Sequence, residues 1–348
     1  MSIITAKTSH TKFESAIGLD LGNYSIKCVE IASNPTKFKL ERVSILPVDR
    51  NSNESIAKAL KAIFDHSPSV TRRVRISVSG GSSLLIRRIQ LPAMTHAELK
   101  GAIRFEAESH IPFPIDDCLL DFQILNQTED KKNMNVILVA AKKDFIHEKL
   151  KILSATNIVP EVIDVDIFCL INAYETLGLE ATDNTFGLLN IGHVSSSFAI
   201  LQDKLPFFVR EIPFGALGVT KALAEIKGIG EAEADRLKIE RPPEILAELK
   251  NAIQKGFEPL VEGMIHSIDY FENETGEELK SIRLSGGGAL CPGTTEVLSE
   301  ELGKEILMWD NTKKMEIFGD IDQKFLAEHS AELNVALGMV MRPVGHKK

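Results

Sequence analysis

The chain has 348 residues, of which 44% are hydrophobic and 26% charged, a composition typical of a globular protein with two or three domains. Its net charge of −9 argues against a nucleic-acid-binding protein, because such proteins normally present a basic surface. No apolar run has signal-peptide character or approaches the roughly 18–20 residues that span a bilayer, and the four cysteines lack metal-binding or disulfide spacing, so we expect a cytoplasmic protein.

The first part of the chain predicts an antiparallel meander followed by a helix. Residues 1–15 are polar, and we expect them to be flexible. Strand-like stretches separated by Gly/Asn and Asn/Pro breaks predict strands at 16–21, 25–32 and 37–46. A helix with one apolar face is predicted at 54–65, and a further strand at 74–78.

Residues 80–157 have a different character and predict an inserted subdomain. A strand at 84–90 precedes a helix that ends near residue 109, and Thr95 with Glu98 forms a capping box at its start. The run Ile111-Pro112-Phe113-Pro114 ends this helix, because each proline removes a donor and restricts the residue before it. Two strands and a helix complete the unit, at 119–125, 136–140 and 144–156.

The remaining elements return to the pattern of the first part. A strand at 159–165 leads into a helix that begins near Asp166. Three more strands are then predicted, at 187–191, 195–201 and 205–212. The last predicted elements are helices at 216–226, 231–237 and 245–273, a strand at 281–284 and a helix at 330–341.

A weak internal repeat is the most informative feature of the sequence. Residues 18–25 align without gaps on residues 188–195. Both copies consist of a strand, a polar residue, an apolar residue, a glycine, a short turn and a second strand. The polar residues are Asp20 and Asn190, and the glycines are Gly22 and Gly192. The repeat predicts that the same meander-and-helix unit occurs twice.

Each glycine turn has the chemistry of a phosphate site. Glycine lets successive backbone N–H groups point into one concavity, which suits phosphate oxygens when a hydroxyl or ammonium group is added. Ser25 and Lys27 supply those groups in the first copy, and Ser195 and Ser196 supply hydroxyls in the second. An acidic residue before the glycine, as in the first copy, is suited to hold a water bound to Mg²⁺. His193 is placed to hydrogen-bond a phosphate.

A third glycine run follows the strand at 281–284. Gly286, Gly287 and Gly288 permit close approach of a base or a phosphate, and the same run would equally serve as a flexible loop. Either of the two earlier turns, taken alone, is also a common hairpin turn. Two turns in matching register, in a chain with a third run at a strand end, favour a nucleotide-binding site.

These motifs together resemble the actin-like ATPase superfamily and, within it, the PilM family of type IV pilus assembly proteins. The first phosphate motif of that family is similar to residues 17–27. The other similar segments occur in order between residues 14 and 343, at Ala107 to Pro114, Arg210 to Gly215 with Thr220, Glu233 to Lys238, Ser285 to Gly288 and Asn334 to Gly338.

The resemblance implies an actin-like (ribonuclease H-like) α/β fold with two duplicated lobes. Residues 16–79 and 158–185, with 331–348, would form subdomain 1A. Residues 80–157 would form an inserted, SHS2-like subdomain 1C, and residues 186–330 subdomains 2A and 2B. ATP or ADP with Mg²⁺ would bind between the lobes. The implied nucleotide-binding residues are Asp20, Gly22, Asn23, Tyr24, Ser25, Lys27, Asn190, Gly192, His193, Ser195, Ser196, Gly215, Asp235, Lys238, Gly286, Gly287 and Gly288.

The resemblance also bears on metal binding and catalysis. Asp20 would hold the metal through water, and Asp20 and Asp164 are the candidate catalytic residues. Asp164 and Asp166 flank Val165 and point to opposite sides if the strand continues, so one would enter the cleft while the other caps the next helix. The family's second phosphate motif usually opens with aspartate, whereas this chain has Asn190. Since positioning of metal and water by charge is most of this chemistry, we expect nucleotide binding with weak or absent hydrolysis.

The implied partner is PilN, an inner-membrane protein. The resemblance implies that the chain binds the short cytoplasmic N-terminal segment of PilN in a groove between subdomains 1A and 1C, and links the membrane complex to the pilus motor and platform proteins. The chain would then lie at the inner membrane through its partner, without direct insertion. Self-association is left open.

Two other functions fit parts of the same pattern. An FtsA-like filament-forming cell-division protein shares subdomain 1C, but it ends in a linker and an amphipathic membrane helix, and no such apolar face follows Met341. A small-molecule kinase of the same superfamily needs a catalytic base near the γ-phosphate, and the sequence places no acid there beyond Asp20 and Asp164.

Overall fold

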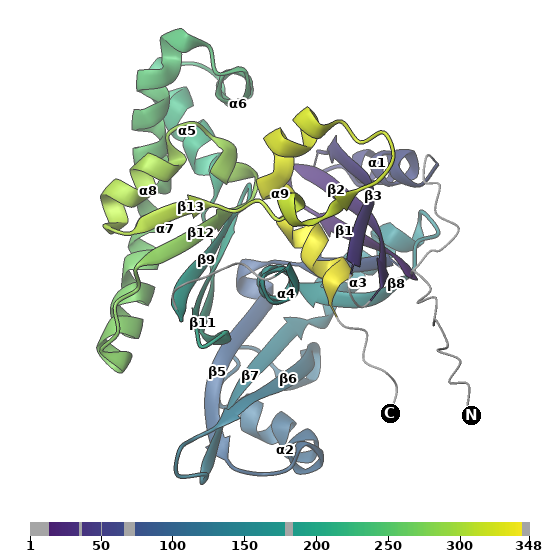
Figure 1. Ribbon diagram of the computed structural model, residues 1–348, viewed down its shortest axis with the longest axis vertical. Helices are drawn as coiled ribbons and strands as arrows, with labels where there is room; N and C mark the ends of the chain where they lie inside the picture. The colour runs from purple at the N-terminus through teal and green to yellow at the C-terminus, as the bar shows by residue number, and fades with distance from the viewer. Residues whose placement is uncertain (1–13, 35–36, 50, 66–73, 178–183, 343–348) are drawn as a thin grey trace, which may run out of the picture.

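The computed structural model describes residues 14–34, 37–49, 51–65, 74–177 and 184–342. They form two lobes, each built on a mixed β-sheet, with a third, smaller sheet beside them (Figure 1). The predicted flexible residues 1–13 and the chain end at 343–348 lie outside the described residues. Residues 14 and 15 belong to the first strand, which begins two residues earlier than predicted.

The first sheet has the strand order β14-β3-β2-β1-β4-β8. Strands β1, β2 and β3 form the predicted antiparallel meander, and β4 and β8 run parallel to β1. The strand bounds are β1 Glu14–Leu21, β2 Ser25–Asn34, β3 Lys37–Pro47, β4 Val74–Val78, β8 Pro160–Val165 and β14 Glu316–Ile317. Helix α1, Asn53–Asp65, buries Ala59, Leu60 and Ile63 against this lobe. The edge strand β14 is too short to show a pattern and was not predicted.

The second sheet repeats this topology, with the order β11-β10-β9-β12-β13. In each sheet the first strand of the meander pairs in parallel with a later strand, so Asp20 lies opposite Ser77 and Asn190 opposite Ser285. The predicted duplication is therefore present in the strand register. The strand bounds are β9 Thr185–Ile191, β10 Ser196–Gln202, β11 Leu205–Ile212, β12 Ser281–Ser285 and β13 Glu305–Met308.

Helices of the second lobe pack on this sheet and extend away from it (Figure 1). The sequence predicted the first three, and α8 and β13 were missed. Helix α7 continues through Pro259 without ending, although a proline inside a helix removes one backbone hydrogen bond. The helix bounds are α5 Ala216–Lys227, α6 Glu231–Glu240, α7 Leu246–Thr275 and α8 Thr294–Leu302.

The third sheet has the order β5-β7-β6, with β5 Leu84–Pro92, β6 Cys118–Gln127 and β7 Asn133–Lys142. Helix α2, His96–Glu108, begins with the predicted capping box of Thr95 and Glu98, and helix α3, Lys143–Ser154, leads back to the first lobe. Strand β5 also contacts β11 of the second lobe, where the Arg88 guanidinium lies 4.5 Å from the ring centroid of Phe207. The extent of the inserted subdomain stays a prediction.

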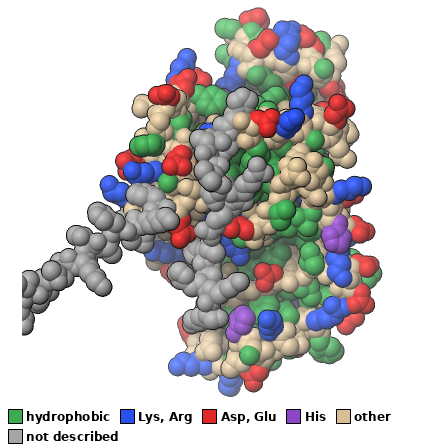
Figure 2. Space-filling view, turned by 90° about the vertical axis from the view of Figure 1, so that its right-hand side faces the viewer, with side chains coloured by type: hydrophobic (Ala, Val, Ile, Leu, Met, Phe, Trp, Pro, Cys, Tyr) green, Lys and Arg blue, Asp and Glu red, His purple; other side chains and the backbone are tan. Residues whose placement is uncertain are grey.

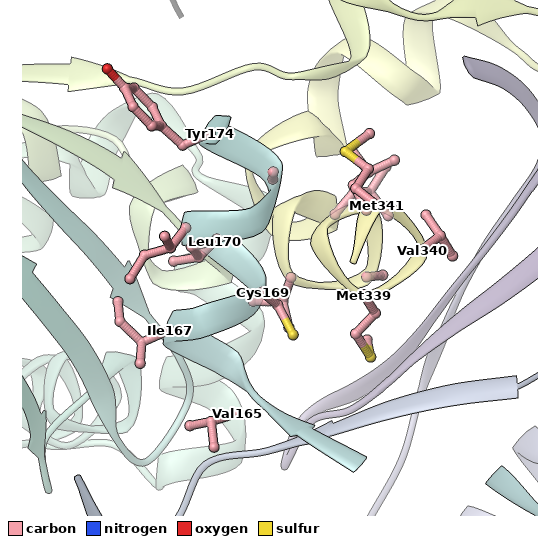
Figure 3. Packing of buried hydrophobic residues seen from close by; sticks show 14 of the residues in the cluster. Val165, Ile167, Cys169, Leu170, Tyr174, Met339, Val340 and Met341 are labelled. Carbon is pink, nitrogen blue, oxygen red and sulfur yellow. The ribbon is translucent and has the colours of Figure 1, made fainter. Parts of the chain in front are cut away.

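Two helices join the lobes. Helix α4, Asp166–Leu177, runs from β8 to β9, and α9, Gln323–Met341, packs across β1, β2 and β4 (Figure 1). Their contact consists of buried apolar side chains, and Cys169 points from α4 toward α9 (Figure 3). Helix α9 begins seven residues before the predicted position, because the Asp322 side chain caps it by accepting from the N–H groups of Lys324 and Phe325.

The end of α9 is fastened to the first lobe by a buried arginine. The Nη1 atom of Arg75 in β4 donates to the carbonyl oxygens of Met339, Val340 and Arg342 at 3.0–3.1 Å, and its Nε donates to Glu161. The last carbonyls of a helix have no partner within the helix, so this contact satisfies groups that would otherwise be buried unpaired.

The surface is mixed in charge. On the face drawn in Figure 2, acidic and basic side chains are interspersed rather than gathered by sign. Among the described residues, no helix is long and apolar enough to cross a membrane.

Candidate functional site

A cavity of about 260 Å³ lies where the two lobes meet. Its walls come from the β1–β2 turn, the β9–β10 turn, the glycine run after β12 and the carboxyl end of α6. The structure therefore brings together segments that are far apart in the sequence. The predicted residues that line it are Asp20, Gly22, Asn23, Tyr24, Ser25, Lys27, Asn190, Gly192, His193, Ser195, Lys238, Gly286, Gly287 and Gly288.

Asp20 and Lys27 form the centre of the first turn. They are opposite each other in the antiparallel pairing of β1 and β2, and their carboxylate and ammonium groups are 3.3 Å apart. Both side chains are almost completely buried. Burial alone would lower the pKa of Lys27, but the charges of Asp20 and Glu332 outweigh it and raise this pKa above its usual value. Lys27 is therefore a fixed positive charge inside the cavity.

The second turn presents amide and hydroxyl groups without a carboxylate. The Gly192 N–H donates to the Ser195 carbonyl at 3.0 Å and closes the turn, and the buried Asn190 lies at the end of β9. The prediction for Ser196 was wrong in direction: its hydroxyl donates to the Phe214 carbonyl at 2.7 Å, away from the cavity. Ser197 lines the cavity instead. Side chains alternate along a strand, so Ser195 and Ser197 share a face that Ser196 does not.

The third glycine run packs directly on the second turn. Gly286 has φ +94, and a Cβ there would overlap the Ile191 carbonyl. The Gly286 N–H donates to Ala331 of α9 at 2.9 Å. Glycine is thus required at this position both for its conformation and for the close approach. The run joins the second turn and α9 into one wall of the cavity.

The carboxylate that enters the cavity beside Asp20 is Asp166 and not Asp164. Asp164, the predicted catalytic candidate, is paired with Arg342 at 2.8 Å and lies outside the cavity. Asp166 opens α4 and lines the cavity. Burial and the charge of Asp20 raise the pKa of Asp166 to about 6, although hydrogen bonds from Ser77 and Ser79 favour its ionised form. The strand ends at Val165, and the change to helix turns Asp166 inward.

Helix α6 supplies a polar network at the other end of the cavity. One oxygen of Asp235 accepts from Lys238 at 2.7 Å and Thr220 at 3.2 Å, and the other accepts from the Tyr24 hydroxyl at 2.9 Å. Burial opposes ionisation, yet the Lys238 ammonium and the two hydroxyls hold the pKa of Asp235 below its usual value. Lys238 lines the cavity directly, whereas Asp235 stands behind it.

Gly215 supports the second turn rather than the cavity itself. It precedes α5, whose first N–H groups donate to the turn: Ala216 to the Gly192 carbonyl at 2.9 Å and Leu217 to the His193 carbonyl at 2.8 Å. Helix starts leave such N–H groups without partners in the helix. The second turn is therefore held in place by a helix N-terminus.

Several cavity residues were not predicted from the sequence. His329 and Glu332 reach the cavity from α9, Leu290, Cys291 and Ile239 add apolar side chains, and Arg241 adds a positive charge. For His329 and Glu332 the sequence signal was the helix cap at Asp322, because a helix that begins there includes both residues three positions apart, on one face.

Two further cavities adjoin the first. One, of about 330 Å³, continues beyond Asp20 and Asp166 and is lined by Ser79, Gly80 and Lys149. The other, of about 510 Å³, lies between α1 and α3 and shares Gly22 and Asn23 with the first. Within the described part of the chain, no group of three or more His, Cys, Asp or Glu residues is arranged to hold a metal ion.

Comparison with known proteins gives a consistent result. The family model described as type IV pilus assembly protein PilM matches residues 18–344. Among solved structures, the PilM-PilN type IV pilus biogenesis complex is similar, with TM-score 0.82 and 25% sequence identity over 94% of this chain and 98% of that chain.

Two more distant structures are also similar. For the ethanolamine utilization protein EutJ from Carboxydothermus hydrogenoformans the TM-score is 0.54, with 13% identity over 95% of this chain and 90% of that chain. For MreB 5 of Spiroplasma citri bound to AMPPNP the TM-score is 0.47, with 12% identity over 94% and 95%. The predicted actin-like α/β fold with two duplicated lobes is confirmed.

Proposed function

This chain belongs to the PilM family of type IV pilus assembly proteins, and on that basis we propose that it is an ATP-binding scaffold that binds the cytoplasmic N-terminal segment of a PilN protein. The observation that carries the nucleotide part is that two glycine turns line one cavity, together with the buried Lys27 ammonium beside the first turn. The partner part rests on the similar PilM-PilN complex.

The cavity has a polar end and a less polar end, which fits the two ends of a nucleotide. Phosphates would lie between the two turns, where backbone N–H groups, Lys27 and Ser195 are available. The ribose would lie near Lys238, and the base against Leu290 and Ile239 beside the third glycine run. A mostly apolar pocket with a few fixed polar groups is the usual form of a nucleotide site.

The donor set also fits a magnesium ion carried by the nucleotide. Mg²⁺ in phosphate sites is bound by one or two carboxylates together with substrate phosphates and waters. Asp20 and Asp166 supply carboxylates at the polar end of the cavity. Bound Mg²⁺ would neutralise phosphate charge. Asn190 contributes an amide where the family usually has a carboxylate, which supports binding with weak or absent hydrolysis.

A groove suited to the partner lies on the first lobe. The cavity of about 510 Å³ between α1 and α3 is at the boundary between the proposed subdomains 1A and 1C. Ile56 and Ile152 line its two sides, and Glu148, Lys149 and Lys151 of α3 add charged groups, so apolar and charged side chains of a bound peptide would both find partners. Bound to the PilN segment through this groove, the protein would lie at the inner membrane and connect the membrane complex to the motor and platform proteins.

Calorimetric titration with ATP and Mg²⁺ tests the nucleotide part. We expect saturable binding to the wild type and a Kd about tenfold higher in Lys238→Ala, which loses a charge-assisted contact. Lys221→Ala is the matched control, because Lys221 is exposed on α5 and outside the cavity. A wild type without measurable affinity for ATP or ADP would refute the proposal.

Titration with a peptide of the PilN cytoplasmic N-terminus tests the partner part separately. We expect saturable binding that is absent for a scrambled peptide. Ile56→Glu should abolish it, since it places a charge in the groove, whereas Lys58→Glu on the exposed face of α1 should not. Equal affinity for the native and scrambled peptides would remove the partner assignment and leave nucleotide binding untouched.

A further inference from the structure

Tyr24 connects the two lobes at the wall of the cavity. Its backbone belongs to the β1–β2 turn of the first lobe. Its hydroxyl donates to Asp235 of α6 at 2.9 Å, and its ring lies 5.1 Å from the ring of His193 in the β9–β10 turn. Both partners belong to the second lobe. One side chain of the first lobe thus contacts the second lobe at two separate points.

The Asp235 end of this connection is fixed. Lys238 and Thr220 hold the other carboxylate oxygen, and Lys238 also bonds the Thr220 hydroxyl at 2.6 Å. The Tyr24 end is less confined, because its side chain is at the surface and 39% exposed. The bond therefore joins an acceptor held by two further groups to a donor on a partly exposed side chain.

The bond persists across the physiological pH range. Burial and the hydrogen bond to Asp235 raise the pKa of Tyr24 to about 12, so the phenol keeps its proton. Hydrogen bonds to a charged group are also stronger than those between neutral groups.

The connection forms part of the cavity wall. Tyr24, His193 and Lys238 all line the cavity, and the bond from Tyr24 runs to Asp235 behind Lys238, so it ties the two lobes together at this wall. The cavity holds about 260 Å³, slightly less than the ~300–1,000 Å³ of typical ligand pockets. With the Tyr24–Asp235 bond formed, the lobes stand close together around a small space.

We propose that Tyr24 is a gate, so that a nucleotide enters and leaves the cavity only while the Tyr24–Asp235 bond is open. The inference rests on the proposed nucleotide binding and adds a control on its rate. Because the same bond joins the lobes before and after binding, the gate sets how fast nucleotide exchanges.

Stopped-flow fluorescence with a fluorescent ATP analogue tests the gate in Tyr24→Phe. This variant keeps the ring against His193 and removes only the hydroxyl. We expect the association and dissociation rate constants both to rise about three- to tenfold. Tyr270→Phe is the matched control, since Tyr270 is exposed on α7 and far from the cavity lining.

Each other outcome is decisive. A higher Kd with unchanged association would mean that the hydroxyl binds the ligand, and unchanged rate constants would mean that the bond gates nothing; either result overturns the gate while nucleotide binding stands. Failure of the wild type to bind any nucleotide would instead refute the proposed function, and the gate with it.

Discussion

Gly338 of α9 lies directly against the carbonyl oxygen of Cys169 where α9 crosses α4, so there is no space for a Cβ at this position. The surrounding side chains, Cys169 and Met339 among them, fill the rest of the contact (Figure 3). Since α4 connects the two sheets and α9 packs on the first, this crossing fixes the distance between the elements that join the lobes.

A methyl group at this crossing should destabilise the fold. Gly338→Ala forces backbone against backbone, and overpacking of this kind costs roughly 1–3 kcal/mol. Urea denaturation should therefore show a loss of about 2 kcal/mol. Gly101→Ala is the control: Gly101 is in α2 with open space around it, so alanine there should stabilise the helix by about 0.5–1 kcal/mol. Equal stability of Gly338→Ala and wild type would contradict the close crossing.

Lys27 should govern phosphate binding. Lys27→Gln removes the buried ammonium group beside the first turn while keeping a side chain of similar length. We expect the Kd for ATP to rise at least about tenfold, and the Kd for adenosine to change much less, because the lost contact is with phosphate. Competition binding measures both. Lys100→Gln on the exposed face of α2 is the control. Equal weakening for ATP and adenosine would place Lys27 away from the phosphates.

Glu211 should make stability fall as pH rises. Its carboxylate is buried on β11 beside Ser197, and burial raises its pKa from 4.5 to about 8 in spite of the nearby hydroxyl. The native state therefore keeps a proton that the unfolded chain releases, and this contribution is lost between about pH 4.5 and pH 8. Asp166, with a pKa of about 6, acts in the same direction over a narrower range.

Glu211→Gln tests this effect because it imitates the protonated acid. At pH 8 the variant should be more stable than the wild type by at least about 2 kcal/mol, and the difference should shrink toward zero near pH 4.5. Denaturation curves over that range measure it. A constant difference at all pH values would show that Glu211 has the same pKa in both states.

The duplicated fold could be predicted from the sequence because each copy contains the complete pattern within a short segment. A strand, a polar residue, a glycine turn and a second strand recur in the same spacing, and in the structure Asp20 and Asn190 occupy matching positions beside their parallel neighbours. The short strands β13 and β14 were missed because two to four residues are too few to show a period.

The predictions of site residues were wrong where the direction of a side chain, and not the type of secondary structure, decided whether it reaches the cavity. The inward turn of Asp166 occurs at a strand-to-helix junction, where neither period applies. Ser197 replaces Ser196 because side chains alternate along β10, and this alternation alone does not say which of the two faces meets the cavity. The contact of Tyr24 with Asp235 spans 211 positions, so no local pattern contains it.

The rate of ATP hydrolysis should depend on Asn190. It is buried at the end of β9, lines the cavity, and faces the glycine run, with its Oδ1 close to Gly286. Asn190→Asp keeps the shape of the side chain and restores one negative charge beside the site proposed for Mg²⁺. Because charge that positions metal and water dominates phosphoryl transfer, we expect Mg²⁺-dependent phosphate release to rise at least about tenfold.

The comparison needs two further measurements to be decisive. Asn190→Ala should bind ATP and release no more phosphate than the wild type, which separates charge from loss of the amide. ATP affinity of Asn190→Asp without Mg²⁺ should fall, because the new carboxylate then repels phosphate, and added Mg²⁺ should restore it. If Asn190→Asp and wild type release phosphate equally slowly while both bind ATP, the slow step lies elsewhere than in the missing charge of the second turn.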